Sequence, residues 1–188
     1  MKKENQRIKL TKRIFKETLI ELLKEKAIYN IKVKELCNKA DLNRTTFYKY
    51  YENIYDVLAD IEYDVLKDSE QCINEIEEIS ESQIKNTLYK QLFNIQKNRD
   101  IYYLLLINSA DNKFYEKLMK TTIDFLKKKI EQANVDLGEN YEYIFSYIIA
   151  GTIDIIKRWL YENTGLDANH IANLIYDLSN KILGISSL

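Results

Sequence analysis

The residues best suited to contact another molecule are polar side chains grouped between positions 44 and 49. Arg44, Thr45 and Thr46 are followed, after one apolar residue, by Tyr48 and Lys49. A guanidinium suits the acceptor pair of a guanine edge, a threonine suits a hydroxyl contact or a thymine methyl, and tyrosine and lysine suit phosphate oxygens. These side chains predict contact with nucleic acid. The alternative is that Arg-Thr-Thr is only the soluble start of a helix.

The charge of the chain is distributed unevenly, although its net value is only -1. Residues 1–51 hold 14 Lys/Arg and 6 Asp/Glu, a charge of +8, and residues 52–188 hold 14 Lys/Arg and 23 Asp/Glu, a charge of -9. A basic first part on an acidic remainder is typical of a chain that meets a polyanion with one end. A solvated lysine-rich face gives the same count, so charge alone leaves both interpretations open.

The elements that carry these residues are predicted to be helices. The chain has no proline and only 4 glycines, and its apolar residues recur at spacings of three and four. This pattern predicts an all-α protein. The first helix is expected to begin at Thr11, whose hydroxyl can cap it, and to carry an apolar stripe as far as Ala27.

Two short helices joined by a tight turn are expected to follow. The second helix covers residues 33–39 and the third covers residues 44–51, with Asn43 as its N-cap. Asp41 lies in the turn between them, where it tolerates left-handed backbone better than most residues. A helix pair of this kind after a longer helix predicts a three-helix DNA-binding domain. The apolar side chains expected to hold the third helix in place are Leu42, Phe47 and Tyr51.

The remaining sequence predicts a helical body. Asn53 is suited to cap a long helix over residues 54–79, which would link the DNA-binding part to the body. The other predicted helices cover residues 83–97, 100–108, 112–132, 139–162 and 168–183, and the clearest loops are 135–138 and 163–167. We therefore expect a helix-turn-helix domain over residues 1–52 and a helical domain over residues 53–188.

Several function classes are disfavoured by the sequence. His170 is the only histidine, and we find no metal-ligand spacing, glycine-rich phosphate loop or nucleophile motif. We expect no enzymatic activity, no cofactor and no metal. Residues 1–16 carry charges throughout, which is unlike a signal peptide, and the longest uncharged stretch, residues 143–153, is far shorter than the roughly 20 residues that span a bilayer. We expect a cytoplasmic protein with no membrane partner.

The two cysteines, Cys37 and Cys72, both lie in predicted helices. In a reducing cytosol they are expected to serve as small core groups, with a redox switch as the alternative.

The segment from Asn43 to Tyr51 reads Asn-Arg-Thr-Thr-Phe-Tyr-Lys-Tyr-Tyr, and Asp-Val-Leu follows at residues 56–58. It resembles the third helix of the tetracycline-repressor (TetR) family of transcriptional regulators, with its Ser/Asn-[Lys/Arg]-x-[Ser/Thr]-[Phe/Leu]-Tyr-x-x-[Phe/Tyr] signature. The resemblance implies an N-terminal helix-turn-helix domain and a C-terminal ligand-binding and dimerisation domain. It also implies a homodimer that binds a palindromic operator in double-stranded DNA.

The resemblance assigns base edges to the first turn of the third helix, and backbone or nearby base contacts to the residues that follow. It assigns phosphate contacts to Thr11 and to the start of the second helix. The full DNA-binding set that it implies is Thr11, Lys32, Val33, Lys34, Asn43, Arg44, Thr45, Thr46, Tyr48, Lys49 and Tyr50.

Three positions depart from the family pattern. Asp41 stands where glycine is usual, which predicts strain of about 1–2 kcal/mol at most. Lys32 replaces the usual threonine cap of the second helix. Ile54 replaces a lysine at the start of the fourth helix, which puts one phosphate contact in doubt.

Two apolar stripes near the C-terminus, over residues 144–160 and 171–182, suit two helices that pack together. They could simply close the core of one chain. The resemblance instead implies a four-helix bundle across a two-fold axis, with close approach at Ala150 and Gly151. The interface residues expected on this view are Ile148, Ile149, Thr152, Ile156, Leu174, Ile175 and Leu178.

The body is rich in aromatic residues that could line a small-molecule cavity, and the resemblance implies an effector without naming it. The candidates are Tyr102, Tyr103, Tyr147 and Trp159, each of which could equally be a core or interface residue. Residues 99–103 and 112–118 further resemble the branch that regulates dihydroxyacetone-kinase operons. We expect a repressor, and the alternative is a co-activator or protein-interaction module that works through a partner protein.

Overall fold

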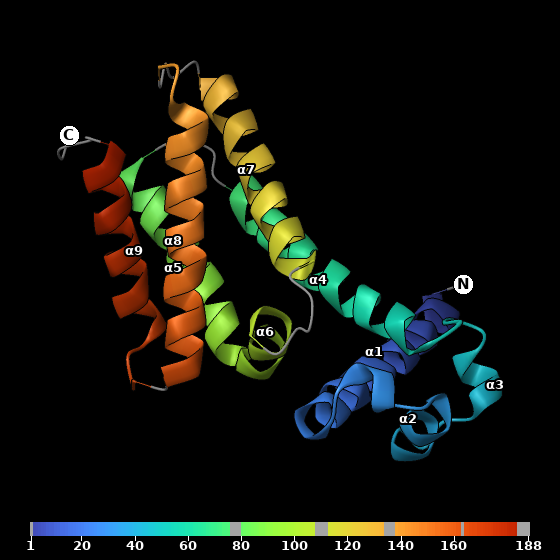
Figure 1. Ribbon diagram of the computed structural model, residues 1–188. Helices are drawn as coiled ribbons and strands as arrows, with labels where there is room; N and C mark the ends of the chain where they lie inside the picture. Colours follow the sequence, from blue (N-terminus) through green and yellow to red (C-terminus); the bar gives the residue numbers. More distant parts are fainter. Residues whose placement is uncertain (1, 76–79, 108–112, 134–137, 163, 184–188) are drawn as a thin grey trace. The chain divides into compact units, whose positions relative to one another are not determined.

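The computed structural model describes residues 2–75, 80–107, 113–133, 138–162 and 164–183. Every regular element in these residues is a helix (Figure 1), which confirms the predicted all-α class. The chain forms two compact units, Met1–Val65 and Leu66–Leu188, which we call the head and the body.

Most of the head is three helices, α1 (Lys2–Glu25), α2 (Val33–Lys39) and α3 (Arg44–Phe47), with a short 3-10 turn, η1 (Ile28–Asn30), after α1. α1 begins well before Thr11, so the prediction that Thr11 caps this helix is wrong. The amphipathic repeat begins only near Ile14, and the polar residues before it extend the same helix. The fully buried side chains of this unit are Phe15, Leu19, Leu36, Phe47 and Val57.

The turn between α2 and α3 has the predicted geometry. Asp41 has a φ of 52°, the one positive φ among the described residues other than glycine. Asn43 caps α3, because its side-chain oxygen accepts a hydrogen bond of 2.9 Å from the amide of Thr45. Regular helix ends at Phe47, earlier than predicted, and a turn follows in which the amide of Tyr51 donates to the carbonyl of Phe47 at 3.0 Å.

The fourth helix, α4 (Ile54–Asn74), is capped from both directions. Asn53 Oδ1 accepts from the amide of Tyr55 at 2.8 Å, as predicted for an N-cap. The Asp56 carboxylate reaches back to accept from the amides of Glu52 at 2.7 Å and Asn53 at 3.2 Å. This reciprocal arrangement satisfies amides that would otherwise be left without partners at the helix start.

The division between the units falls within α4, after Val65. Ile54, Val57 and Ile61 of this helix are buried, and Asp60 is bonded to α1. The first turns of α4 therefore belong structurally to the head. The functional boundary at residues 52 and 53 stays a prediction.

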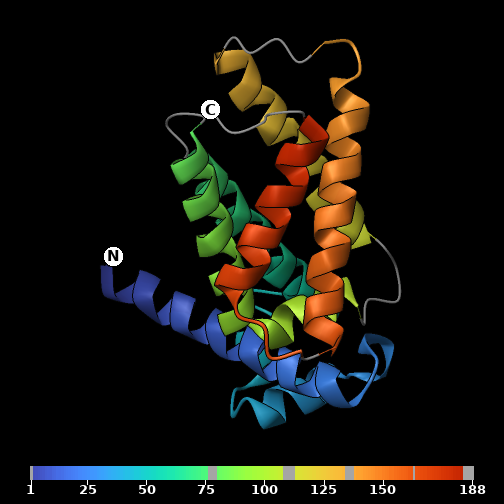
Figure 2. The ribbon, with the colours of Figure 1, turned by 90° about the vertical axis from the view of Figure 1, so that its left-hand side faces the viewer.

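The body contains α5 (Glu81–Lys97), α6 (Arg99–Leu106), α7 (Lys113–Ala133), α8 (Tyr141–Glu162) and α9 (Ala168–Leu183). α5 packs along α9, and α8 contacts α6, α7 and α9. Figures 1 and 2 show α8 and α9 as antiparallel neighbours. Each of these helices was predicted to within about two residues. The predicted loop at residues 135–138 and the ends predicted at residues 79, 108 and 112 lie largely outside the described residues.

Candidate nucleic-acid interface

The polar residues of α3 and of the turn after it point outward from the head. Arg44, Thr45, Tyr48 and Lys49 are exposed, with Tyr48 retaining 60% of its accessible surface. Thr46, like Tyr50 in the turn, is half-buried. The segment from α3 into the turn after it therefore offers a guanidinium, hydroxyls, a phenol and an ammonium group within six residues, 44–49.

The opposite side of α3 is fixed by an aromatic cluster. The ring of Phe47, which has no accessible surface, lies edge-on to Phe15 of α1 with centroids 5.4 Å apart. Tyr51 packs against both rings, at 5.7 Å from Phe47 and 6.2 Å from Phe15. Edge-to-face contacts of this kind favour one relative orientation of the rings. Of the three residues predicted to hold α3 in place, Phe47 and Tyr51 are therefore packed in the cluster, and Leu42 is half-buried.

The start of α2 supplies two further cations. Lys32 and Lys34 are exposed and Val33 between them is half-buried. Lys32 occupies the N-cap position without a side-chain hydrogen bond to the helix, as its replacement of threonine predicts. Thr11 is half-buried in the middle of α1.

The cations of the head differ in how they are paired. Lys26 is 2.5 Å from a Glu35 carboxylate oxygen and Lys39 is 3.4 Å from Glu25. Four other cations, two at the start of α2 and two in α3 and the turn after it, form no ion pair with any of the described carboxylates. They are Lys32, Lys34, Arg44 and Lys49.

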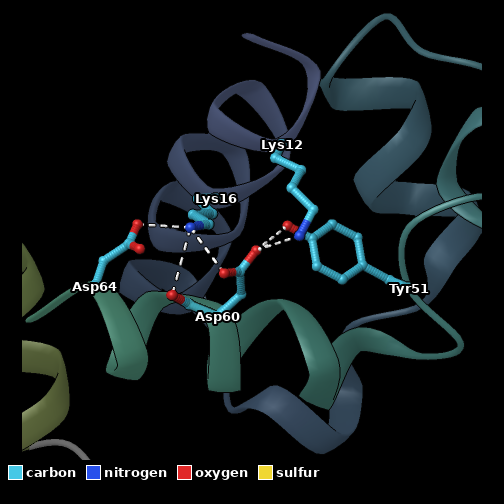
Figure 3. Close-up of polar contacts among 5 residues, drawn as sticks. All are labelled: Lys12, Lys16, Tyr51, Asp60 and Asp64. Carbon is cyan, nitrogen blue, oxygen red and sulfur yellow. Dashed lines mark hydrogen bonds and ion pairs between the residues drawn. The ribbon is translucent and has the colours of Figure 1, made fainter. Parts of the chain in front are cut away.

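A partly buried polar cluster connects α1, the turn after α3, and α4 (Figure 3). The Tyr51 hydroxyl donates to Asp60 Oδ2 at 2.7 Å, and Lys12 Nζ donates to the same oxygen at 3.1 Å. Lys16 Nζ lies 3.1 Å from Asp60 Oδ1 and 2.6 Å from Asp64 Oδ2. Its members are separated along the chain and form no motif, so the sequence alone does not reveal this cluster.

The cluster shifts two pKa values. Burial opposes ionisation of Asp60, but the hydrogen bonds from Tyr51, Lys16 and Lys12 outweigh it and hold the pKa of the carboxyl below its usual value. Burial, together with the bond to Asp60, raises the pKa of the Tyr51 phenol far above its usual value. Asp60 is therefore a carboxylate and Tyr51 a neutral donor at neutral pH.

The start of α4 is closed to a phosphate. Ile54, where the family pattern has lysine, is buried. The amides of Glu52 and Asn53 are already taken by the Asp56 carboxylate, whose charge would also repel an anion. The geometry therefore agrees with the sequence in arguing against a phosphate contact at the start of α4.

Comparison with known proteins shows which family has this architecture. A sequence profile described as "Transcriptional regulator C-terminal region" (TetR_C_8) matches residues 82–181, just over half of the chain. The chain belongs to the TetR family of transcriptional regulators. This confirms the predicted family, which is one of regulators and not of enzymes.

Individual TetR-family relatives are distant. The uncharacterized HTH-type transcriptional regulator YxbF of Bacillus subtilis is 21% identical over 169 residues, which cover 87% of this chain and 43% of the relative. The chain thus spans less than half the length of that curated relative.

Solved structures of TetR-family regulators share the fold, and two of them illustrate it. The dihydroxyacetone kinase operon activator DhaS is 20% identical with a TM-score of 0.66, and covers 95% of this chain and 98% of its own. FadR from Thermus thermophilus, a TetR-family repressor in complex with lauroyl-CoA, is 13% identical with a TM-score of 0.62, covering 94% and 97%. An activator and a repressor are therefore both built on this arrangement of helices.

The four predicted pocket residues of this TetR-family body differ in how far they are exposed. Tyr147 keeps 68% of its surface exposed on α8, and its place in a ligand cavity stays a prediction. Trp159 is buried, and its Nε1 donates to the carbonyl of Leu166 at 2.8 Å. Tyr102 is buried and accepts from Asn94 Nδ2 at 3.3 Å, and burial raises its pKa to about 12. Tyr103 is half-buried.

The predicted dimer residues divide by burial. Leu174 and Leu178 on α9 are 39% and 41% exposed, and Ile182 one turn further is 42% exposed. Ile149 and Ile175 keep only 5% and 3% of their surface and face the interior of the body. These two form part of the core, so their assignment to an interface is wrong. The remaining predicted interface residues, Ile148, Thr152 and Ile156, are half-buried.

Two side chains that the sequence analysis did not single out join α5 and α6 to the turn between α8 and α9. The Arg99 guanidinium donates to the carbonyls of Trp159 and Leu160, which lie in the last turn of α8. Gln96 Oε1 accepts from the amide of Ala168, the first residue of α9, at 3.2 Å. Arg99 thus supplies a donor for carbonyls at the end of one helix, and Gln96 supplies an acceptor for an amide at the start of the next, where the helix itself offers no partner.

No helix in the described part of the chain is long and apolar enough to cross a membrane. Within the same residues, no cluster of three or more His, Cys, Asp or Glu side chains could hold a metal ion.

Proposed function

We propose that this protein is a sequence-specific DNA-binding regulator of transcription that acts as a homodimer on a palindromic operator. The observation that carries the proposal is the two-sided arrangement of α3. Its inner side is fixed by Phe47 against α1, while Arg44, Thr45, Tyr48 and Lys49 face outward. A recognition helix needs both a rigid seat and exposed groups at its N-terminal end.

The exposed groups match the chemistry of a major groove. Arg44 in the first turn can donate two hydrogen bonds to guanine O6 and N7, and Thr45 can contact a base edge or a thymine methyl. Tyr48 and Lys49 can donate to phosphate oxygens, as can Lys32 and Lys34 at the start of α2. The full proposed DNA-binding set remains that implied by the family pattern.

A homodimer suits this head because two recognition helices then meet half-sites about one helical turn, or a little more, apart. We place the dimer contact on α8 and α9, where Leu174 and Leu178 remain exposed. Repression is the proposed direction, because occupying an operator needs no further contact with polymerase. A small-molecule effector bound in the body would release it, as ligand binding can in a two-state regulator.

The proposal is tested with the full chain and DNA from upstream of its own gene, by fluorescence anisotropy at several salt concentrations. Three lysines per protomer, or about six per dimer, predict a slope of log K against log salt near -5. A separate reporter assay, with the same upstream DNA fused to a reporter gene, shows whether binding lowers or raises transcription.

Arg44→Ala tests direct reading of the sequence. We expect it to weaken operator binding by about 1–3 kcal/mol and to relax preference at one base pair. Lys181→Ala is the matched control, because Lys181 is an exposed cation at the end of α9, and it should leave affinity unchanged. If no genomic fragment binds tightly or with salt dependence, the co-activator or interaction-module interpretation replaces this one.

A further inference from the structure

Asp60 is the central member of the polar cluster in the head. Its two carboxylate oxygens accept from Tyr51, Lys12 and Lys16, and its backbone carbonyl accepts from Lys16 at 3.4 Å (Figure 3). The side chain is 21% exposed, so these bonds compete with little water. One residue of α4 therefore bonds to two residues of α1 and to the residue that ends the turn after α3.

Tyr51 is the member of this cluster that reaches the proposed recognition segment. Its amide closes the turn on the Phe47 carbonyl, and its ring packs on Phe47 and Phe15. Lys12 Nζ also lies 5.1 Å from the centre of this ring. A phenylalanine would make the same aromatic contacts, so the hydroxyl bond to Asp60 is an addition to the aromatic cluster.

Tyr48 and Lys49 lie between two fixed points. Phe47 before them is fully buried, and Tyr51 after them is anchored by its hydroxyl. Regular helix has already ended at Phe47, so the turn carrying these residues lacks the stiffness of a continuing helix. Their direction thus depends on the second anchor more than it would in a longer helix.

We propose that Asp60 is a positioning residue for DNA recognition, which acts through the Tyr51 hydroxyl to fix the end of the segment that presents Tyr48 and Lys49. The inference rests on the proposed DNA-binding function. Asp60 itself need not touch DNA. Its role is to hold Tyr51, while Lys12 and Lys16 hold Asp60.

The test uses three single variants of the full chain. Tyr51→Phe removes one hydroxyl without changing charge or ring packing. Asp60→Asn removes the carboxylate at the centre of the cluster. Asp64→Asn is the matched control, because Asp64 lies one turn further along α4 and pairs with the same Lys16, but the bonds of Tyr51 do not involve it. Both Asn variants remove one negative charge, so any general electrostatic gain in DNA binding is common to them.

The first readout is the ratio of affinities for operator and scrambled DNA, at a temperature where circular dichroism shows every variant folded. Tyr51→Phe and Asp60→Asn should each lower this ratio at least about fivefold, since a hydrogen bond to a charged group contributes at least that factor. Affinity for scrambled DNA should persist, because phosphate contacts remain. A further variant that combines Tyr51→Phe with Asp60→Asn should be no worse than the more severe single variant, since both substitutions act on the same Tyr51–Asp60 bond.

The second readout needs no DNA. Amide hydrogen exchange at residues 50 and 51, whose amides donate to the Phe47 carbonyl, should accelerate at least about fivefold in Tyr51→Phe and Asp60→Asn, because local opening is easier without the anchor. Asp64→Asn should match wild type in both readouts.

The outcomes separate this inference from the function on which it rests. If the wild-type chain binds no DNA, the proposed DNA-binding function is wrong. Faster exchange in Tyr51→Phe and Asp60→Asn would still show that the bond between Tyr51 and Asp60 anchors the turn. Wild-type binding with an unchanged ratio in Tyr51→Phe and Asp60→Asn overturns the positioning role. An equal loss in Asp64→Asn also overturns it, because the effect would then be one of charge.

Discussion

Adjacent side chains in the head have opposite environments, and this alternation allows one short segment both to fold and to bind. Phe47 has no accessible surface, yet Tyr48 beside it is 60% exposed and touches the Phe47 ring only at its edge, with centroids 5.4 Å apart. Tyr51 combines both environments, since its ring lies in the aromatic cluster and its hydroxyl lies in the polar one. Single-atom substitutions in this segment can therefore separate packing from positioning.

Stability of the head should depend on the ionisation of Asp60. Its pKa is lowered on folding by bonds from Tyr51, Lys16 and Lys12 that outweigh burial. The stabilisation is thus present above the unfolded pKa of about 4 and is lost as pH falls through the lower folded value. The thermal midpoint of wild type should exceed that of Asp60→Asn near neutral pH, and the gap should close in acid. A gap that stays constant down to pH 3 would show that ionisation of Asp60 is not the source.

At the scale of elements, α2 and α3 are joined by a turn that uses a residue other than glycine in left-handed backbone. Asp41 has a φ of 52°, and the next two residues lead into the Asn43 cap. Left-handed backbone costs an L-residue about 1–2 kcal/mol, less for Asp than for most. The aromatic packing of Phe47 holds α3 in place despite this strain.

Asp41→Gly should therefore stabilise the head by up to about 1 kcal/mol, because glycine adopts this conformation without strain. Part of this gain is lost, because glycine makes the unfolded chain more flexible. Asp41→Ala is the control, since it keeps the Cβ and loses the aspartate's tolerance of this backbone. Urea unfolding followed by far-UV circular dichroism should rank the variants Gly, then Asp, then Ala. The reverse order would mean that the Asp41 side chain contributes more than the strain costs.

At the scale of the whole molecule, the exposed apolar side chains of α9 have a regular spacing. Leu174, Leu178 and Ile182 follow one another at intervals of four residues, so they share one side of the helix. Ile171 and Ile175, each three residues before one of these leucines, lie on the adjoining side and are buried in the body. The apolar surface of α9 is therefore wider than the part that is buried within a single chain.

Leu178→Glu should dissociate the proposed dimer, because it would bury a charge in an apolar contact between chains. Sedimentation velocity should show a monomer, and operator affinity should fall with it. Phe93→Glu is the control, as Phe93 is a comparably exposed apolar residue (52%) on α5. Dissociation by Phe93→Glu instead of Leu178→Glu would move the contact from α9 to α5.

Local sequence was sufficient for features that depend on neighbours along the chain. The helical class, the turn at Asp41, the caps at Asn43 and Asn53, and the outward placement of Arg44 and Lys49 were all predictable, because caps, turns and amphipathic faces are set by residues within one or two helical turns. The cap assigned to Thr11 failed, because a polar stretch without apolar periodicity can still extend an existing helix.

Tertiary structure decided what depends on residues distant in sequence. Periodicity marks an apolar side of a helix but cannot tell a buried side from an exposed one, so Ile149 and Ile175 were assigned to an interface although they lie in the core. The bonds from Lys12 and Lys16 to Asp60 span 48 and 44 residues, and no local pattern encodes them. Only folding brings α1 and α4 together, and with them the carboxylate that holds Tyr51.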